Sequence, residues 1–303
     1  MGNINSFTVI ILTYNNFNLM HHALESLSKQ KTPPNILSQL VIVDDGSECL
    51  HYDEINELIR DYGLEEKFRV NLHINEKNLG TVKSFNLALS IADGDVIIPL
   101  SADDELYDDS VICDILKFFS ENESANIVTC LRAPIISGEE VGFLPSKEKW
   151  HLFESSSTLY KYITFRGNFI SGASTYYRRN LIIPTGFDQN YRYIEDFPFF
   201  LRQLLAGEKI YLFRRISIRY GTNGVSSRIS RNSIVYTDYK KIWLDIMRVN
   251  KRRGLFYLRF VYFNHVILNT GPITFSIFLR YPEQVIFRFG VNLINWLRRN
   301  HGN

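Results

Sequence analysis

Four short apolar runs punctuate the first 131 residues, and amphipathic stretches separate them. The apolar runs lie at 8–12, 40–43, 96–100 and 127–131. Each has about the length of a buried parallel strand and shows almost no polar alternation. Apolar residues recur at helical spacing over 17–29, 53–62, 81–91 and 109–119. This alternation of strands and helices predicts an α/β fold with a mostly parallel, doubly wound sheet and flanking helices.

Polar residues follow three of these strands at the point where each strand ends. They are Thr13, Tyr14 and Asn15 after the first run, Asp44 and Asp45 after the second, and Asp103 and Asp104 after the third. Ligands of open α/β sheets bind beyond the carboxyl ends of the strands, so we expect these groups on one rim. Two adjacent carboxylates suit a divalent metal ion or a ribose. Asp44 to Ser47 is also an ordinary turn and capping sequence, which leaves a purely structural interpretation open.

Two helix starts carry further candidate residues. Gly80 stands at the entrance of the third predicted helix, where backbone amides can meet a phosphate, and Lys83 follows in its first turn. Glu195 and Asp196 begin a later helix that Gly207 ends, and a carboxylate there can act as a general base. The simpler alternatives are a solvated lysine and two acids that only favour the start of the helix.

The composition is that of an ordinary globular protein. Of the 303 residues, 45% are hydrophobic and 22% are charged, which suits one large α/β domain with an appendage. Cys49, Cys113 and Cys130 form no Cys-x-x-Cys pair, which indicates a reducing compartment and no structural zinc site. No basic stretch followed by an apolar core precedes the first strand, so we expect no secretory signal.

The C-terminal segment differs chemically from the rest of the chain. From Ile246 onward nine Lys or Arg residues accompany one acid, Glu283, although the whole chain has a net charge of only +2. A helix is predicted over 234–249, and apolar, aromatic pieces follow, none reaching the ~20 residues that span a bilayer. Such pieces are typical of helices at an anionic membrane surface, so we expect membrane contact through 251–303. Packing on the preceding domain or a homodimer face is the alternative, and the apolar content argues against nucleic-acid binding.

Five segments form an ordered set along the first three quarters of the chain. They are TVIILTYNN (8–16), VIVDDGS (41–47), NLGTVKSFNLAL (78–89), ADGDVIIPLSADD (92–104) and GFD…ED…R…G (186–207). Together they resemble the inverting family 2 glycosyltransferases with the A-type nucleotide-sugar-binding fold, of the bacterial surface-polysaccharide type. We therefore expect a catalytic domain over 1–232, with a donor half over 1–131 and an acceptor half over 132–232. The basic, aromatic helical tail then covers 233–303.

The resemblance implies how the donor would be bound. Thr13, Tyr14, Asn15 and Asp44, with Asp45, would contact the nucleoside of a nucleotide-sugar, expected to be a UDP-sugar. The expected nucleotide-sugar-binding residues also include Gly80, Lys83 and Asp103.

The resemblance also implies a metal site and a catalytic base. Asp103 and Asp104 would be the acids of the family's Asp-x-Asp motif, and they would hold Mn²⁺ or Mg²⁺ over the diphosphate. The first acid usual in that motif is Ser101 here, and the loop that often supplies a histidine contains none. Asp196, beside Glu195, would take the proton from the acceptor hydroxyl in a single displacement.

These implications define an expected activity and its alternatives. The chain would transfer a sugar to a glycan or a polyprenyl-diphosphate-linked oligosaccharide in O-antigen or capsule assembly, in the cytoplasm at the inner face of the membrane. Ser101 and Phe85 motivate one alternative, a non-catalytic scaffold partner of another glycosyltransferase. A sugar nucleotidyltransferase is the other, although the first strand is followed by no Gly-rich, basic triphosphate loop. The absence of G-x-G-x-x-G there makes a dehydrogenase still less suitable.

Overall fold

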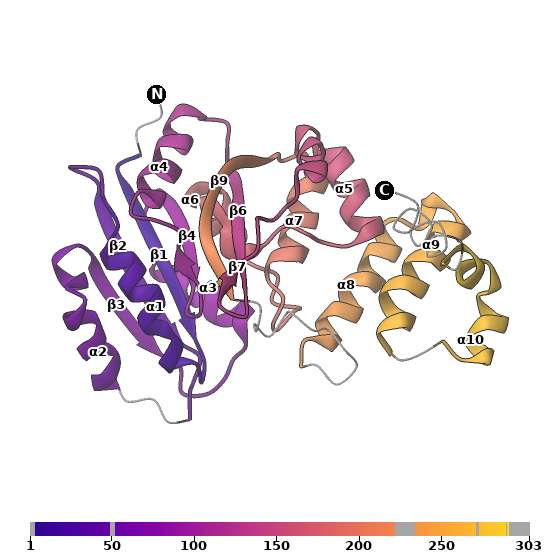
Figure 1. Cartoon of the computed structure of the whole chain (residues 1–303), viewed down its shortest axis with the longest axis horizontal. Coiled ribbons are helices and arrows are strands. Elements are labelled where there is room, and N and C mark those ends of the chain that lie inside the picture. Colours follow the sequence, from indigo (N-terminus) through magenta and orange to yellow (C-terminus); the bar gives the residue numbers. More distant parts are fainter. Residues whose placement is uncertain (1–3, 49–51, 222–233, 271–272, 289, 291–303) are drawn as a thin grey trace. The chain divides into compact units, whose positions relative to one another are not determined.

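The structure, a computed structural model, divides into two compact units. It describes residues 4–48, 52–221, 234–270, 273–288 and 290. The first unit comprises Met1–Ile163 and Asn168–Ser227, and the second comprises Thr164–Gly167 and Arg228–Asn303. The first unit contains the sheet, and the second is helical (Figure 1).

The first unit is built on a nine-stranded sheet with the order β3-β2-β1-β4-β8-β6-β9-β5 and with β7 beside β6. The strands are β1 (Ser6–Thr13), β2 (Leu37–Asp44), β3 (Arg69–Ile74), β4 (Val96–Ser101), β5 (Glu105–Leu106), β6 (Ile127–Ile136), β7 (Glu139–Glu140), β8 (Thr175–Arg178) and β9 (Ile210–Gly221). Strands β1 to β4 pair in parallel, and β8 is antiparallel to both β4 and β6. β6 therefore runs in the direction of β4, and the carboxyl ends of β1, β2, β4 and β6 lie on one rim.

The helices that precede β9 cover both faces of this sheet. They are α1 (Phe17–Ser28), α2 (Tyr52–Asp61), α3 (Thr81–Ile91), α4 (Val111–Glu121), α5 (Ser156–Arg166), α6 (Arg179–Thr185) and α7 (Asp196–Leu205). The predicted α/β fold is confirmed, including the four strands and four helices expected before residue 132.

Alternation along the strands separates the two apolar layers. Phe7, Val9 and Ile11 point to one face, where they join a buried core with apolar side chains of α1, α2 and α4. Tyr176 belongs to this core, whereas the next residue, Tyr177, contacts Phe187 and Phe199 of a separate aromatic group. Phe85 of α3 packs edge-on against Phe187 in that group. The second layer therefore links α3, β8 and α7.

Strands β3 and β9 and an extension of β6 are among the elements that go beyond the four predicted strands. β3 carries polar residues at alternate positions, and β9 contains Arg214-Arg215 beside an irregularity in its pairing with β6. Residues 132–136, which lie beyond the apolar run 127–131, continue β6. These segments are stabilised by pairing with neighbouring strands, which an apolar run does not reveal.

The second unit contains short helices. They are α8 (Tyr236–Val249), α9 (Leu255–Tyr262), a π-helical turn (Phe263–Ile267) and α10 (Phe275–Arg280). α8 confirms the helix predicted over 234–249. The Trp243 and His265 rings stack 3.6 Å apart, and burial lowers the pKa of His265 to about 4. Of the helices in the described ranges, none combines the length and apolar composition that a bilayer crossing needs.

Candidate active site

The ends of β1 and β2 are joined by a short chain of hydrogen bonds. The Asn15 N–H donates to Ser47 Oγ at 2.8 Å, and Ser47 donates to Asp44 from its backbone N–H (2.8 Å) and its hydroxyl (2.6 Å). Asn15 has a φ of +50°, which turns the chain sharply at the end of β1. Thr13 and Asp44 are buried, and Tyr14 is exposed beside them in sequence. Thr13, Tyr14, Asn15 and Asp44 are thus brought together at the rim.

Asp45 has a structural environment different from that of Asp44. Its carboxylate accepts hydrogen bonds from the N–H groups of Leu79 (2.8 Å) and Gly80 (2.9 Å). It also accepts from Ser84 Oγ at 2.7 Å and from Asn75 Nδ2 at 3.0 Å. Four protein donors therefore engage this buried group and fix the entrance of α3 to the end of β2.

Gly80 and Lys83 stand at that entrance. Gly80 has a φ of +90°, and a Cβ there would lie 2.6 Å from the carbonyl oxygen of Arg192. Arg192 in turn accepts the N–H of Val82 at 3.0 Å and donates to Asn78. Only glycine suits this close approach. Lys83 is exposed on the first turn of α3.

Asp103 and Asp104 follow β4 on the same rim, but only Asp104 is fully buried. Asp104 Oδ1 accepts the N–H of Gly221 at 3.3 Å, and Oδ2 is buried without a hydrogen-bond partner among the described residues. Burial raises the pKa of Asp104 to about 7, and the neighbouring charge of Asp103 adds to the shift. An unpartnered buried carboxylate oxygen needs a proton or a cation.

Glu195 and Asp196 lie at the start of α7. Asp196 Oδ2 accepts the N–H of Gly172 at 3.0 Å, and Oδ1 accepts the N–H of Phe197 at 2.6 Å. Each residue keeps some accessible surface, and the carboxyl groups are the enclosed part. Burial raises the pKa of both carboxyl groups. The charge of Asp196 raises that of Glu195 further, whereas the two N–H donors and Arg132 oppose the shift at Asp196.

Arg132 of β6 interacts electrostatically with both Asp104 and Asp196. Its Nη1 donates to the Phe169 carbonyl at 3.5 Å, and its guanidinium lies 5.6 Å from the centre of the Tyr220 ring. Burial lowers the pKa of this guanidinium, and the two carboxylates oppose that effect. Sequence reasoning missed this residue. The available signal was a single cation within the otherwise apolar run IVTCLRAPII.

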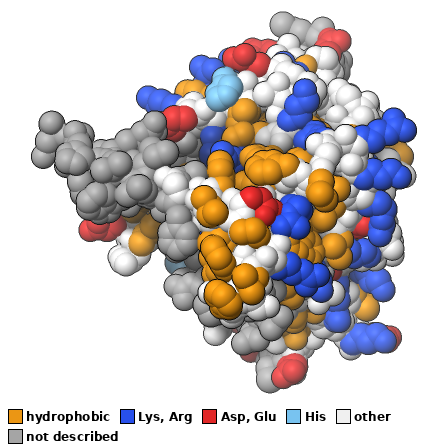
Figure 2. Space-filling model, turned by 90° about the vertical axis from the view of Figure 1, so that its right-hand side faces the viewer, with side chains coloured by type: hydrophobic (Ala, Val, Ile, Leu, Met, Phe, Trp, Pro, Cys, Tyr) orange, Lys and Arg blue, Asp and Glu red, His pale blue; other side chains and the backbone are white. Residues whose placement is uncertain are grey.

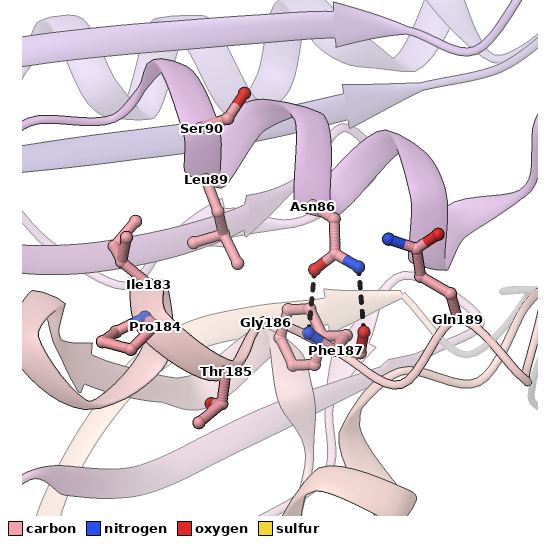
Figure 3. A pocket seen from close by; sticks show the side chains of 9 residues that line it. All are labelled: Asn86, Leu89, Ser90, Ile183, Pro184, Thr185, Gly186, Phe187 and Gln189. Carbon is pink, nitrogen blue, oxygen red and sulfur yellow. Dashed lines mark hydrogen bonds between the residues drawn. The ribbon is translucent and has the colours of Figure 1, made fainter.

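A pocket of about 280 Å³ lies between α3 and the segment that follows α6 (Figure 3). Asn86 donates to the Phe187 carbonyl at 2.9 Å and accepts its N–H at 2.8 Å. Arg202 of α7 donates to the Gly186 carbonyl at 2.5 Å. None of the predicted site residues lines this pocket. The bonds of Asn86 and Arg202 instead tie α3 and α7 to the segment 186–187, which accounts for the Gly-Phe and Arg positions of the last motif.

The acids at the end of β4 fit a hard divalent cation. Within the described ranges, no three His, Cys, Asp or Glu side chains are close enough to form a ready metal cluster. Asp104 nevertheless offers the buried, unpartnered Oδ2, and Asp103 adds a second carboxylate. Mn²⁺ and Mg²⁺ prefer oxygen ligands and commonly take the remainder from substrate phosphates and water. The residues present therefore suit Mn²⁺ or Mg²⁺ bound together with a diphosphate.

Comparison with known sequences identifies one family. The model of "Glycosyl transferase family 2" matches residues 8–184, so Glu195 and Asp196 lie beyond the matched segment. An uncharacterized glycosyltransferase of Haemophilus influenzae is 25% identical over 82% of this chain and 79% of its own. The minor teichoic acid biosynthesis protein GgaA of Bacillus subtilis is 27% identical over 68% of this chain, and the match spans 44% of GgaA.

Solved structures share the fold. TarS of S. aureus superposes with a TM-score of 0.60 at 20% identity, over 86% of this chain and 44% of that one. A TarS 1–349 complex with UDP-GlcNAc superposes with a TM-score of 0.58 at 19% identity, over 86% of this chain and 67% of that one. The mannosyltransferase PcManGT from Pyrobaculum calidifontis, in complex with GDP-Man and Mn²⁺, superposes with a TM-score of 0.56 at 14% identity. The match covers 95% of this chain and 79% of that one.

Proposed function

Because the chain belongs to glycosyl transferase family 2, we propose that it transfers a sugar from a nucleoside diphosphate donor to an acceptor hydroxyl by a single inverting displacement. The observation that carries this proposal is the link through Arg132 between Asp104 and Asp196. A partly buried cation that interacts with both acids supports one site, with a donor side at β4 and an acceptor side at α7. The TarS complex with UDP-GlcNAc supports a uridine nucleotide as the donor.

The donor side would follow the rim of the sheet. Thr13, Tyr14, Asn15 and Asp44 would contact the nucleoside, and Asp103 its ribose. Asp45 would act indirectly, since its carboxylate is engaged by four protein donors. The expected diphosphate-side residues are Gly80 and Lys83.

Asp196 would act as the base on the acceptor side. Its carboxylate would take the hydroxyl proton while the hydroxyl oxygen bonds to the anomeric carbon and the bond to the diphosphate oxygen breaks. Enclosure raises its pKa, which strengthens it as a base, and the N–H of Gly172 holds one oxygen in place. Glu195 would stand beside this base with its own proton held to higher pH, because the charge of Asp196 raises its pKa. Bound at Asp103 and Asp104, Mn²⁺ or Mg²⁺ would neutralise charge on the leaving diphosphate.

The acceptor would be a glycan of the bacterial cell surface, carried on a polyprenyl diphosphate. The similarity to GgaA, which is named for minor teichoic acid biosynthesis, supports this class of acceptor. The glycan would be one that is built in O-antigen or capsule assembly. Such an acceptor is held at the inner face of the cell membrane, so the enzyme would work in the cytoplasm, with peripheral contact through 251–303. A homodimer through the same segment is the alternative.

A donor screen tests the proposal. Purified protein with Mn²⁺ is incubated with a panel of sugar nucleotides, with and without lipid-linked acceptors, and release of nucleoside diphosphate is measured. We expect one donor to be turned over, and Asp196→Asn to abolish transfer while donor binding persists. Asp61→Asn, an exposed acid on α2, is the matched control.

Other outcomes favour the alternatives. Unchanged glycan synthesis in cells carrying Asp196→Asn would favour the scaffold function. Release of pyrophosphate from a nucleoside triphosphate and a sugar phosphate would favour a nucleotidyltransferase.

A further inference from the structure

Large apolar side chains are left exposed on the second unit. Leu255 of α9 is 72% exposed, Phe275 and Leu279 of α10 are 75% and 63% exposed, and Ile286 is 63% exposed. Phe256, at 58%, adjoins Leu255. We call these five residues the apolar face. Figure 2 shows hydrophobic side chains gathered on this side of the molecule, with Lys and Arg along their border. Large apolar side chains gathered on an exposed surface are typical of an interaction site.

Hydrogen bonds from one arginine join the helices that carry the apolar face. Arg259 donates to Glu283 Oε1 at 2.6 Å and to the Arg280 carbonyl at 2.7 Å. Leu255 precedes Arg259 by one helical turn, and Leu279 is adjacent to Arg280. Leu255 and Arg259 share one side of α9, because residues four apart do so in a helix, and the bond to the Arg280 carbonyl ties that helix to the end of α10, where Leu279 stands. The apolar face is therefore held in a defined arrangement.

The charge beside the apolar face is positive. Lys251, Arg252 and Arg253 are exposed in the turn that leads into Leu255. Glu283 is the single acid from residue 246 onward, and its carboxylate is paired with Arg259. The three cations of the turn thus adjoin exposed apolar side chains in the sequence, and no acid occurs between residues 246 and 282.

We infer that the apolar face and the 251–253 turn bind the surface of an anionic lipid bilayer. Apolar side chains would enter the headgroup boundary, and the cations would meet lipid phosphates. This deepens the membrane contact in the proposed function by naming its residues and the charge of the lipid. A second copy of the chain fits less well, because a twofold contact uses the same surface of both copies and would gather both cationic turns in one interface.

Vesicle flotation of the full-length protein tests the inference. We expect binding to vesicles of phosphatidylcholine with phosphatidylglycerol and little binding to phosphatidylcholine alone. Lys251→Glu with Arg252→Glu should weaken binding about tenfold or more. Leu255→Ser with Phe256→Ser should also weaken binding to the anionic vesicles, although it leaves the net charge unchanged. Two variants of the first unit serve as controls: Arg60→Glu with Lys117→Glu, which changes the net charge equally, and Leu37→Ser, which removes an apolar side chain that is 76% exposed.

Three results would overturn the inference. They are equal binding to neutral and anionic vesicles, equal loss in the control variants, and a stable dimer without vesicle binding that Leu255→Ser with Phe256→Ser dissociates. Release of nucleoside diphosphate from a soluble donor is measured on the same samples and should be unchanged in all variants. Vesicle binding without donor turnover would contradict the proposed function and leave the inference standing.

Discussion

Gly172 donates its N–H to Asp196 Oδ2 at 3.0 Å, and a Cβ on Gly172 would lie 3.1 Å from Asp196 Cβ and 3.2 Å from Glu195 Oε1. Gly172→Ala would keep the donated hydrogen bond and shift both carboxylates by a few tenths of an ångström. We expect kcat to fall about tenfold, since small displacements of a catalytic group are costly, with little change in KM for the donor. Steady-state kinetics check this. Gly138→Ala, where an added Cβ would meet no atom of the described residues within 4 Å, is the control.

The raised pKa of Glu195 predicts a pH-dependent difference in stability. The folded protein holds the Glu195 proton more tightly than the unfolded chain does, so this group's contribution to stability is present at acidic pH. The contribution is lost as the pH rises through the raised pKa. Glu195→Gln should therefore melt near the wild-type temperature at about pH 4 and clearly above it at about pH 9. Melting curves of both proteins at the two pH values test this. An equal difference in melting temperature at both pH values would contradict the raised pKa of Glu195.

The same substitution predicts a change in the pH dependence of catalysis. The charge of Asp196 raises the pKa of Glu195, so Glu195 ionises after Asp196 as the pH rises. Glu195→Gln removes this second ionisation, so any change of kcat/KM at alkaline pH that comes from it should disappear, while the acidic limb stays where it is. Asp188→Asn, which leaves the pair intact, should keep the alkaline change.

Arg132 should contribute to catalysis without being needed for the fold. Arg132→Met keeps an unbranched apolar stem and removes the charge that opposes the raised pKa of Asp196 and Asp104. We expect kcat to fall about a hundredfold and the acidic limb to move to higher pH. Arg132→Lys should recover part of the rate. A parallel loss of far-UV circular dichroism would indicate a structural role instead.

Asp104 predicts how activity depends on metal. Asp104→Asn removes the charge of the buried oxygen that has no partner in the described structure, so more Mn²⁺ should be needed for half-maximal rate, by about tenfold. Asp103→Asn should have a smaller effect, because that side chain is partly exposed. Titration of Mn²⁺ into chelator-treated enzyme measures both. Equal and full activity without added metal would contradict a metal site.

Asp45 should matter for stability more than for direct donor contact. Asp45→Ala leaves the N–H groups of Leu79 and Gly80 without their acceptor and frees the start of α3. We expect a loss of about 3 kcal/mol in unfolding free energy. Chemical denaturation measures it, with the exposed Asp61→Ala as control.

Strand-end residues were the part of the site that sequence could predict. An apolar run fixes where a strand ends, and parallel strands bring their ends to one rim, so Thr13, Asp44 and Asp104 could be grouped in advance. Which of two adjacent acids faces the rim could not be predicted. Neighbouring residues at a strand end point in different directions, and Asp45 proved to be engaged by the start of α3.

Arg132 could not be predicted for a different reason. Its importance comes from two acids that are distant in sequence and reach it only through the order of strands in the sheet. β9 was missed because it is stabilised by its long pairing with β6 rather than by an apolar run of its own.

The insertion of β8 between β4 and β6 has a consequence for the order of folding. The strands β1 to β4 pair among themselves, so this half of the sheet can form as soon as β4 has left the ribosome. β6 pairs with β8 and β9, and both of these strands come later in the chain. We therefore expect the nucleoside side of the rim to form early, while Arg132 and the start of α7 reach their positions only after β9 is synthesised. Catalytic activity in a nascent chain would then report completion of the whole first unit.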